Sequence, residues 1–234
     1  MSSDTGQQHH GHQHQHGHQH GHGEEVDPAQ FYRQEYWDER YGGEQVWSGN
    51  PNTLLVQYAS ALTPGTALDV GSGEGGDVIW LARRGWQVTG ADISAVALRR
   101  SADAAEQAGP EVAARITWQQ ADLLHWEPPA AAFDLVSAQF IHLPTDLRED
   151  LHRRLAAAVR PGGTLLIVSH HPADIEGAHR PNAPVMFATA TEMAAVLDPA
   201  AWTIEAAEPE REGAWPDGGT GTVRDAVLRA VRRR

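Results

Sequence analysis

The fold of this chain follows from one stretch of sequence, Ala67-Leu68-Asp69-Val70-Gly71-Ser72-Gly73-Glu74-Gly75-Gly76-Asp77. Its apolar beginning predicts a strand, and Val78, Ile79 and Leu81 beyond its end predict a helix. The turn between them is rich in glycine, which has no Cβ atom, so a small ligand can lie against the backbone over the first amides of the helix. A strand, a glycine-rich turn and a helix in this order indicate a nucleotide-binding α/β unit.

An acidic residue closes the next predicted strand, in Gly90-Ala91-Asp92-Ile93-Ser94. Asp92 lies 92 − 71 = 21 positions after Gly71, the first glycine of the turn. This spacing suits a carboxylate that accepts hydrogen bonds from the two hydroxyls of a ribose. The glycine turn and Asp92 together predict an adenosine-containing cofactor.

Two classes of cofactor compete for this turn. Gly71, Gly73 and Gly76 have the G-x-G-x-x-G spacing of a dinucleotide site, which would make the chain an NAD(P)-dependent oxidoreductase. Asp69 and Glu74 favour S-adenosylmethionine instead, because carboxylates repel a pyrophosphate and attract the sulfonium and ammonium groups of that cofactor. A structural alternative is that Asp69 only ties down the loop by hydrogen bonds.

The segment Leu68 to Gly75 resembles motif I of the class I S-adenosylmethionine-dependent methyltransferases. Further segments resemble this family in the family's own order: Asp92, Gln120-Ala121-Asp122-Leu123, Phe133-Asp134-Leu135-Val136-Ser137 and Arg160-Pro161-Gly162-Gly163-Thr164-Leu165. The resemblance implies that Asp92 binds the ribose, and that Asp122 and the following backbone amide bind the adenine. The segment before the core, with Trp37, Arg40-Tyr41 and Trp47 to Asn52, is similar to the small methyltransferases of the tellurite-resistance and thiopurine type.

The resemblance also implies a set of site residues and a fold. The cofactor-binding residues would be Trp37, Asp69, Gly71, Ser72, Gly73, Asp92, Ile93, Asp122, Leu123 and Gln139. The fold would be α/β, a Rossmann-like doubly wound, mostly parallel seven-stranded sheet with an antiparallel final strand. The alternation of strands and helices from Ala67 onward likewise predicts a parallel sheet with helices on both faces and ligands at the carboxyl ends of the strands.

Periodicity and capping signals place the individual elements. We expect strands at 67–70, 87–91, 116–120, 134–138, 164–169 and 202–206, and helices at 76–84, 94–108 and 145–159. Asn50 should cap a helix that has Pro51 at its first position, and Thr191 should cap another short helix. The segment 222–232 has a helical period, but the family topology requires a strand there, and we follow the family.

Composition bounds the function. The 234 residues are 41% hydrophobic, which suits one well-packed core, and the net charge of −13 disfavours nucleic acids and anionic membranes as partners. The sequence has no long apolar run and no signal-peptide core, so we expect a cytoplasmic protein. Cysteine and lysine are absent, which excludes thiolate nucleophiles, disulfides and Schiff-base chemistry. Methyl transfer from a sulfonium needs none of these.

We expect three regions: a disordered His-rich tail over 1–26, an N-terminal helical cover over 27–64 and the methyltransferase core over 65–234. The tail carries alternating imidazoles that, when neutral, bind Ni²⁺, Zn²⁺ or Cu²⁺: His9, His10, His12, His14, His16, His18, His20 and His22. This metal affinity could be incidental. It also leaves open a metal-binding or sensing protein with a vestigial methyltransferase core.

The expected reaction is in-line displacement at the sulfonium methyl group, for which positioning alone can lower the barrier by roughly 7–11 kcal/mol. Gln139 is a candidate contact to the methionine part of the cofactor. His142, just after the fourth strand, is a candidate base or acceptor contact, or else a structural residue at the helix entry. His171 is a second candidate, because at most one of the adjacent His170 and His171 should face the pocket. No N-P-P-Y or D-P-P-Y segment follows the fourth strand, so a small-molecule acceptor is expected, with monomer and homodimer both open.

Overall fold

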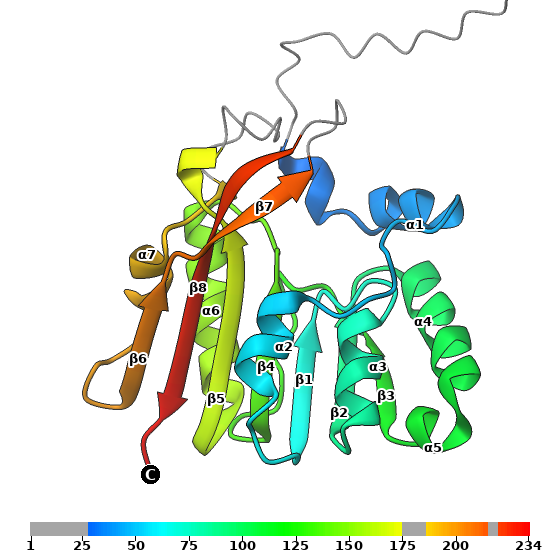
Figure 1. Ribbon diagram of the computed structural model, residues 1–234, viewed down its shortest axis with the longest axis horizontal. Coiled ribbons are helices and arrows are strands. Elements are labelled where there is room, and N and C mark those ends of the chain that lie inside the picture. Colours follow the sequence, from blue (N-terminus) through cyan, green and yellow to red (C-terminus); the bar gives the residue numbers. More distant parts are fainter. Residues whose placement is uncertain (1–27, 175–185, 215–219) are drawn as a thin grey trace, which may run out of the picture.

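The computed structural model describes residues 28–174, 186–214 and 220–234, and Figure 1 shows their arrangement. A central sheet carries helices on both faces. The histidine tail predicted over 1–26 lies outside the described residues. In the described part of the chain, no helix has the length and apolar character required to span a membrane.

The sheet has eight strands in the order β3-β2-β1-β4-β5-β8-β6, with β7 paired to β8. Strands β1 to β5 are parallel, and β8 runs antiparallel to both β5 and β6. Their bounds are β1 Thr66–Val70, β2 Gln87–Asp92, β3 Ile116–Gln120, β4 Phe133–Gln139, β5 Val159–His170, β6 Trp202–Ala207, β7 Glu210–Ala214 and β8 Thr220–Arg232. The predicted Rossmann-like sheet with an antiparallel last strand is confirmed, and β7 adds one strand that was not predicted.

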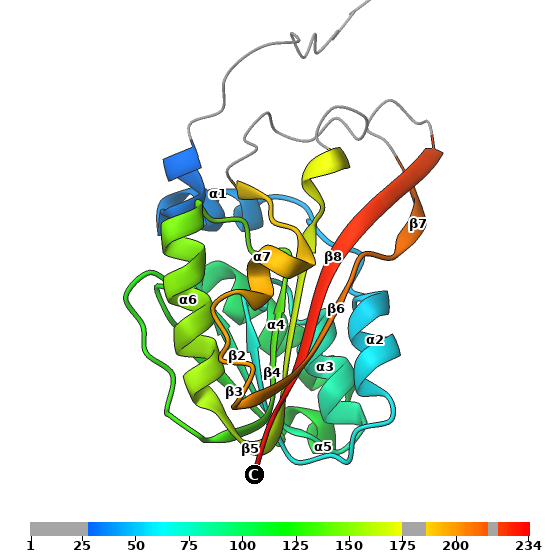
Figure 2. The same cartoon turned by 90° about the vertical axis from the view of Figure 1, so that its left-hand side faces the viewer.

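The helices form two layers around the sheet (Figure 2). One face is covered by α2 (Thr53–Ala59) and α3 (Gly76–Arg83), with α4 (Ala95–Ala108) and α5 (Pro110–Ala113) beside α3. The other face is covered by α6 (Thr145–Ala158) and α7 (Ala190–Ala194). Near the chain start, η1 (Pro28–Tyr32) precedes α1 (Gln34–Gly42), and η2 (Pro172–Asp174) follows β5.

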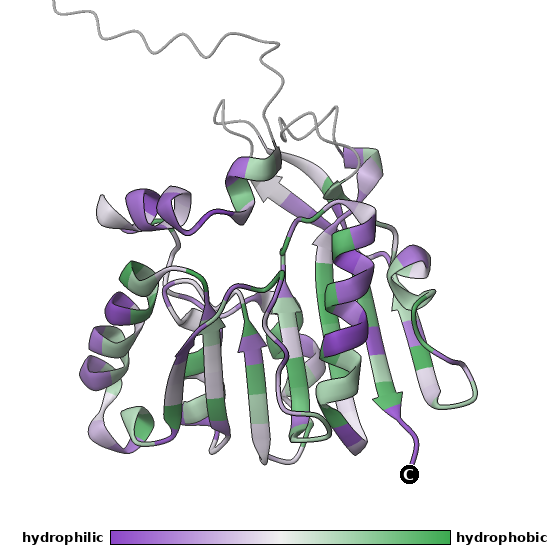
Figure 3. Cartoon of the chain, turned by 180° about the vertical axis from the view of Figure 1, so that it is seen from behind, coloured by the Kyte–Doolittle hydropathy of each residue, from purple (hydrophilic) through white to green (hydrophobic). Residues whose placement is uncertain are grey.

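Two apolar clusters hold these layers on the sheet. Leu155 of α6 packs with Leu165 of β5 in one cluster, and Leu55 of α2 packs with Leu81 of α3 in the other. Each of these side chains is at most 1% exposed, and burying such a side chain contributes roughly 1.5–3 kcal/mol. Figure 3 shows hydrophobic residues concentrated along the central strands. The sheet is therefore a rigid platform for the loops at its edge.

Two predicted helix starts were wrong by two residues. Asn52, not Asn50, caps α2, because its Oδ1 accepts the amides of Leu54 at 2.8 Å and Leu55 at 3.4 Å. Thr189, not Thr191, caps α7 through a reciprocal capping box with Glu192. Both observed caps are residue types that the same capping rule favours, and they lie two residues from the predicted caps, a difference that sequence spacing alone does not resolve.

The carboxyl ends of β1 to β5 meet at one edge of the sheet, where ligands bind in such folds. Within the predicted cover, α1 lies beyond this edge in both Figure 1 and Figure 2, whereas α2 packs on the sheet. The β7–β8 pair reaches the same edge from the other side. The site is therefore bounded by α1 on one side and by β7 and β8 on the other.

Candidate active site

The glycine turn between β1 and α3 is closed by its own hydrogen bonds. The amides of Gly71 and Ser72 both donate to the carbonyl of Ala91, at 2.8 and 3.1 Å, and the amide of Gly73 donates to Asp92 Oδ2 at 2.8 Å. Gly73 has φ +51°, and a Cβ there would lie 3.0 Å from the Tyr41 hydroxyl. The turn thus offers close approach to its backbone, but these three amides already have acceptors and are not free for a phosphate.

Asp92 stands at the end of β2 and is 6% exposed. Its two oxygens accept the amides of Gly73, at 2.8 Å, and Ser94, at 2.9 Å. Burial raises the pKa of its carboxyl, although these hydrogen bonds work against the rise. Each oxygen keeps a second lone pair, so Asp92 can still accept from a ligand hydroxyl.

The residues predicted for the adenine lie at the neighbouring strand end. The amide of Ala121, just after β3, donates to the carbonyl of Asp92 at 2.9 Å, which fixes the two strand ends side by side. Asp122 is exposed, and its Oδ1 accepts the amide of Leu124 at 2.9 Å. Ile93 and Leu123 are half-buried beside it. The structure therefore brings together the four residues predicted around the nucleoside.

Two more acidic residues gather under the turn. Burial, together with the nearby charges of Asp77 and Asp92, raises the pKa of Asp69 well above its ordinary value. Burial also raises the pKa of Asp77 to about 6, opposed by the amide of Asn52, which donates to Asp77 Oδ1 at 2.6 Å. Three carboxyl groups in one partly desolvated place favour a cationic ligand and disfavour a phosphate.

Three buried oxygens at this place have no hydrogen-bond partner among the described residues: Asp69 Oδ1, Ser72 Oγ and Gln139 Oε1. Asp69 and Ser137 are register partners on β1 and β4, and Gln139 Nε2 donates to Ser137 Oγ at 2.9 Å. A buried polar atom left unpaired costs about 1–3 kcal/mol. An ionised Asp69 and the amide oxygen of Gln139 can only accept, so a ligand that donates hydrogen bonds and carries positive charge would satisfy both.

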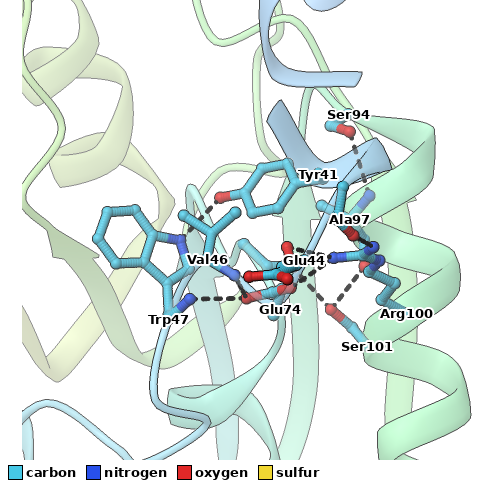
Figure 4. Close-up of polar contacts among 11 residues, drawn as sticks. Tyr41, Glu44, Val46, Trp47, Glu74, Ser94, Ala97, Arg100 and Ser101 are labelled. Atoms are coloured by element: carbon cyan, nitrogen blue, oxygen red, sulfur yellow. Dashed lines mark hydrogen bonds and ion pairs between the residues drawn. The ribbon is translucent and has the colours of Figure 1, made fainter. Parts of the chain in front are cut away.

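Glu74, by contrast, is engaged in a structural contact (Figure 4). Its Oε2 accepts the amides of Val46 at 3.0 Å and Trp47 at 2.9 Å, and its Oε1 pairs with Arg100 at 3.0 Å. Arg100 also donates to the carbonyl of Gly43. The carboxylate is therefore neutralised and fastens the chain start to the turn. The prediction that Glu74 favours a cationic cofactor was therefore wrong. The preference of the turn for a cation depends on Asp69, Asp77 and Asp92 instead.

Aromatic residues of the chain start cover the turn. Tyr41 is 3% exposed, its hydroxyl accepts Trp47 Nε1 at 3.0 Å, and burial raises its pKa to about 12. Trp37 stacks on Tyr41 with ring centroids 5.8 Å apart and donates its indole N–H to the Phe31 carbonyl at 3.0 Å. Asp38 Oδ1 accepts the Ser94 hydroxyl at 2.6 Å and so ties α1 to the start of α4. A cofactor contact by Trp37 remains a prediction.

The loop after β4 brings further aromatic rings to the carboxyl edge of the sheet. Phe140 has φ +56°, a left-handed conformation that costs a bulky residue roughly 1–3 kcal/mol and that clusters at functional sites. Its ring lies 4.3 Å from that of His170. His142 stacks on His170 at 5.0 Å with an interplanar angle of 19°, and Phe187 meets His142 edge-on at 5.1 Å. These four rings form the aromatic wall.

Of the two adjacent histidines after β5, His170 is the one in this wall. Both ring nitrogens of His171 have other contacts: Nδ1 accepts the Ala173 amide at 3.1 Å, and Nε2 lies 3.3 Å from Glu208 Oε2. At most one of the pair was expected to face the pocket, with His171 as the candidate; here the ring that stacks on His142 is that of His170. Alternation along β5 could not decide between them, because the strand ends there.

Sequence reasoning missed two residues behind His170. Asp225 of β8 is 1% exposed, and its Oδ1 lies 3.5 Å from His170 Nδ1. Arg211 of β7 donates from Nε to Asp225 Oδ2 at 2.5 Å. Burial opposes ionisation of Asp225, but the contact with His170 and the hydrogen bonds from Arg211 outweigh it and hold the pKa of this carboxyl below its usual value. The only sequence signal was an acidic residue directly before the apolar run Ala226-Val227-Leu228.

No group of three or more metal-ligating side chains occurs among residues 28–174, 186–214 and 220–234. The predicted tail ligands His9 to His22 lie outside these ranges.

Comparison with known proteins gives a consistent result. The profile of a methyltransferase domain matches residues 67–163. An uncharacterised methyltransferase of Mycobacterium bovis is 38% identical over 128 residues, which are 54% of this chain and 61% of that protein. This chain thus spans less than two thirds of the length of that relative. A 2-heptyl-1-hydroxyquinolin-4(1H)-one methyltransferase of Mycobacteroides abscessus is 25% identical over 188 residues, covering 77% of this chain and 78% of that protein.

The predicted similarity to thiopurine methyltransferases is also found. A thiopurine S-methyltransferase of Aliivibrio fischeri is 28% identical over 153 residues, covering 58% of this chain and 70% of that protein. The solved structure of the N-methyltransferase NodS from Bradyrhizobium japonicum, in complex with S-adenosylhomocysteine, has the same fold with a TM-score of 0.64, at 18% identity and covering 86% of this chain and 98% of that one. These matches show that residues 67–163 carry a methyltransferase domain, and that the described chain has the same fold as a solved methyltransferase.

Proposed function

We propose that this protein transfers the methyl group of S-adenosylmethionine to a small-molecule acceptor by in-line displacement. The observation that carries the proposal is the pair of buried, donor-seeking oxygens, Asp69 Oδ1 and Gln139 Oε1, beside raised carboxyl pKa values at the glycine turn. An ammonium group has three N–H donors and a positive charge, so it satisfies both features. When bound, S-adenosylmethionine supplies an electrophilic methyl group on a sulfonium.

Each group of residues would bind the part of the cofactor that its chemistry suits. Asp92 would hold the ribose hydroxyls, and Asp122, with Ile93 and Leu123, would hold the adenine at the ends of β2 and β3. Asp69 and Gln139 would hold the ammonium. Gly71, Ser72 and Gly73 would let the cofactor approach the backbone, with Trp37 and Tyr41 as its cover. Such fixed contacts align the reacting atoms and exclude water, which is the main requirement of the reaction.

The acceptor is proposed to be a planar aromatic molecule with an acidic hydroxyl or thiol. The aromatic wall of Phe140, His142, His170 and Phe187 supports this, because aromatic rings stack on planar molecules. Two relatives, a 2-heptyl-1-hydroxyquinolin-4(1H)-one methyltransferase and a thiopurine S-methyltransferase, are named for acceptors of the same class. His142, which follows β4 in the same loop as Phe140, would contact the acceptor.

Isothermal titration calorimetry tests the cofactor. We expect S-adenosylhomocysteine to bind with micromolar or better affinity and neither NADH nor NADPH to bind. Binding of a dinucleotide without binding of S-adenosylhomocysteine would refute the proposal and favour the oxidoreductase alternative. A sensing protein with a vestigial core predicts that methyl transfer is absent or needs the histidine tail, so activity retained after removal of residues 1–26 argues against it.

A further inference from the structure

The antiparallel pairing of β5 with β8 sets His170 directly opposite Asp225. His170 Nδ1 lies 3.5 Å from Asp225 Oδ1, and Arg211 holds the other oxygen of the same carboxyl at 2.5 Å. The His170 side chain is 14% exposed and that of Asp225 is 1% exposed. The three residues come from three strands and form one chain of contacts that ends in the aromatic wall.

The charges around His170 fix the position of its proton. Arg211 keeps Asp225 ionised, and an ionised carboxylate can only accept a hydrogen bond. The proton of a neutral His170 therefore sits on Nδ1, the nitrogen that faces Asp225, and Nε2 carries a lone pair. Because the two nitrogens lie on opposite sides of the ring, Nε2 is turned away from Asp225.

The other described elements near His170 contribute aromatic rings, and carboxylates that contact other groups. The loop after β4 contributes the rings of His142 and Phe140. Glu208 faces His171 at 3.3 Å, and Asp174 accepts the backbone amide of Arg224. Among residues 28–174, 186–214 and 220–234, Asp225 is the carboxylate in contact with the His170 ring, and Arg211 reaches that ring through Asp225.

From this geometry we infer that His170 is a catalytic base that takes the proton of the acceptor through Nε2, with Asp225 and Arg211 as positioning residues. The inference rests on the proposed function. The acceptor oxygen forms its bond to the methyl carbon, the carbon–sulfur bond breaks with its electron pair left on sulfur, and the hydroxyl proton moves to His170 Nε2. The acceptor class is thereby narrowed to a nucleophile that is protonated when it binds, such as an aromatic hydroxyl.

Nitrogen NMR of the full-length protein labelled with ¹⁵N-histidine tests the arrangement without turnover. Signals of His170 are those lost in His170→Gln. We expect wild-type His170 to be the Nδ1–H tautomer when neutral, and Asp225→Asn to lower its titration midpoint by about one pH unit, because an opposite charge at this range shifts a pKa by that order. An Nε2–H tautomer in the wild type, or an unchanged midpoint in Asp225→Asn, overturns the inference.

Methyl transfer gives the second readout, with 2-naphthol and 2-naphthalenethiol as probes at pH 8, where only the thiol is largely ionised. His170→Gln should lower kcat for the naphthol about 100-fold, in the range of general base catalysis, and change kcat for the thiol less than threefold. Equal losses with both probes would mean that His170 only shapes the wall, and would overturn the inference. If neither probe is methylated by the wild type, the tautomer and the midpoint decide.

Matched variants guard against loss of structure. His171→Gln changes the neighbouring histidine, and Glu205→Gln removes a β6 carboxylate that pairs with Arg229 of β8 at 3.1 Å, away from the wall. Both should keep the naphthol rate within twofold, and a loss in His171→Gln as large as in His170→Gln would overturn the assignment. Failure of every variant and of the wild type to bind S-adenosylhomocysteine would instead refute the proposed function, since His170 is not among the cofactor residues.

Discussion

Replacing Asp77 by asparagine should stabilise the cofactor-free protein at neutral pH. Burial raises the pKa of this carboxyl from its ordinary 3.8 to about 6. Because the folded state binds the Asp77 proton more tightly than the unfolded state does, the stability that this proton contributes is fully present below about pH 4. It is lost as the pH rises to about 6. At about 1.36 kcal/mol per unit, the loss is about 3 kcal/mol and persists at pH 7.5.

Asparagine keeps the shape of the side chain and an oxygen for the Asn52 amide, which Asp77 accepts at 2.6 Å, but it has no charge to bury. We therefore expect Asp77→Asn to raise the free energy of unfolding by up to about 3 kcal/mol at pH 7.5. For a chain of this size the melting temperature should rise by about 6–12 °C. At pH 4 the gain should vanish. Circular dichroism melts at the two pH values measure both.

A matched control is Asp103→Asn, which removes an exposed carboxylate from the neighbouring helix α4 and should leave the melting temperature unchanged. The reasoning is refuted if Asp77→Asn melts below the wild type at pH 7.5, or if it gains equally at both pH values. The same substitution should weaken binding of S-adenosylmethionine more than that of S-adenosylhomocysteine, because only the former carries the sulfonium charge.

Three further substitutions test other parts of the site. Asp92→Asn should weaken S-adenosylhomocysteine binding about 10- to 100-fold in calorimetry, because hydrogen bonds to a charged group contribute roughly 1.5–3 kcal/mol; unchanged affinity would contradict the ribose assignment. Gly73→Ala, at φ +51° and with a Cβ 3.0 Å from the Tyr41 hydroxyl, should lower stability by about 1–3 kcal/mol in urea denaturation. Arg100→Met should cost about 1–2 kcal/mol and expose residues 43–47 to proteolysis, since Glu74 loses its partner; intact wild-type resistance would contradict the fastening role.

The sequence predicted best what is local. The glycine turn, the strand before it and the helix after it depend on a few adjacent residues, so β1, α3 and β2 appear within one residue of their expected bounds. The position of Asp92 likewise follows from a fixed number of residues in a βαβ unit. The fold class and the proposed location of the cofactor could therefore be predicted from one stretch of sequence and the spacing of Asp92 after it.

Contacts between distant segments were not accessible. Glu74 looks like an exposed charge beside the ligand, but Arg100, one helix later, neutralises it. The segment that became β8 is buried on both faces over Asp225 to Leu228, so it has no two-residue alternation there, and its apolar residues fit a helical period as well as a strand. Without that strand in place, no pattern could link Asp225 to His170 across 225 − 170 = 55 positions.

The site is thus built from two parts of the chain with different demands. The residues proposed for the cofactor lie, apart from Trp37 and Tyr41, within the matched domain at 67–163, as expected for a ligand shared by a whole family. His170, Phe187, Arg211 and Asp225 follow that domain. They reach the acceptor side because β8 runs against β5 and so carries the chain back to the carboxyl edge of the sheet, where β7 pairs with it. Under the proposed function, the reversal of β8 therefore lets residues that follow the matched domain contribute to the acceptor side, while most of the proposed cofactor residues lie within that domain.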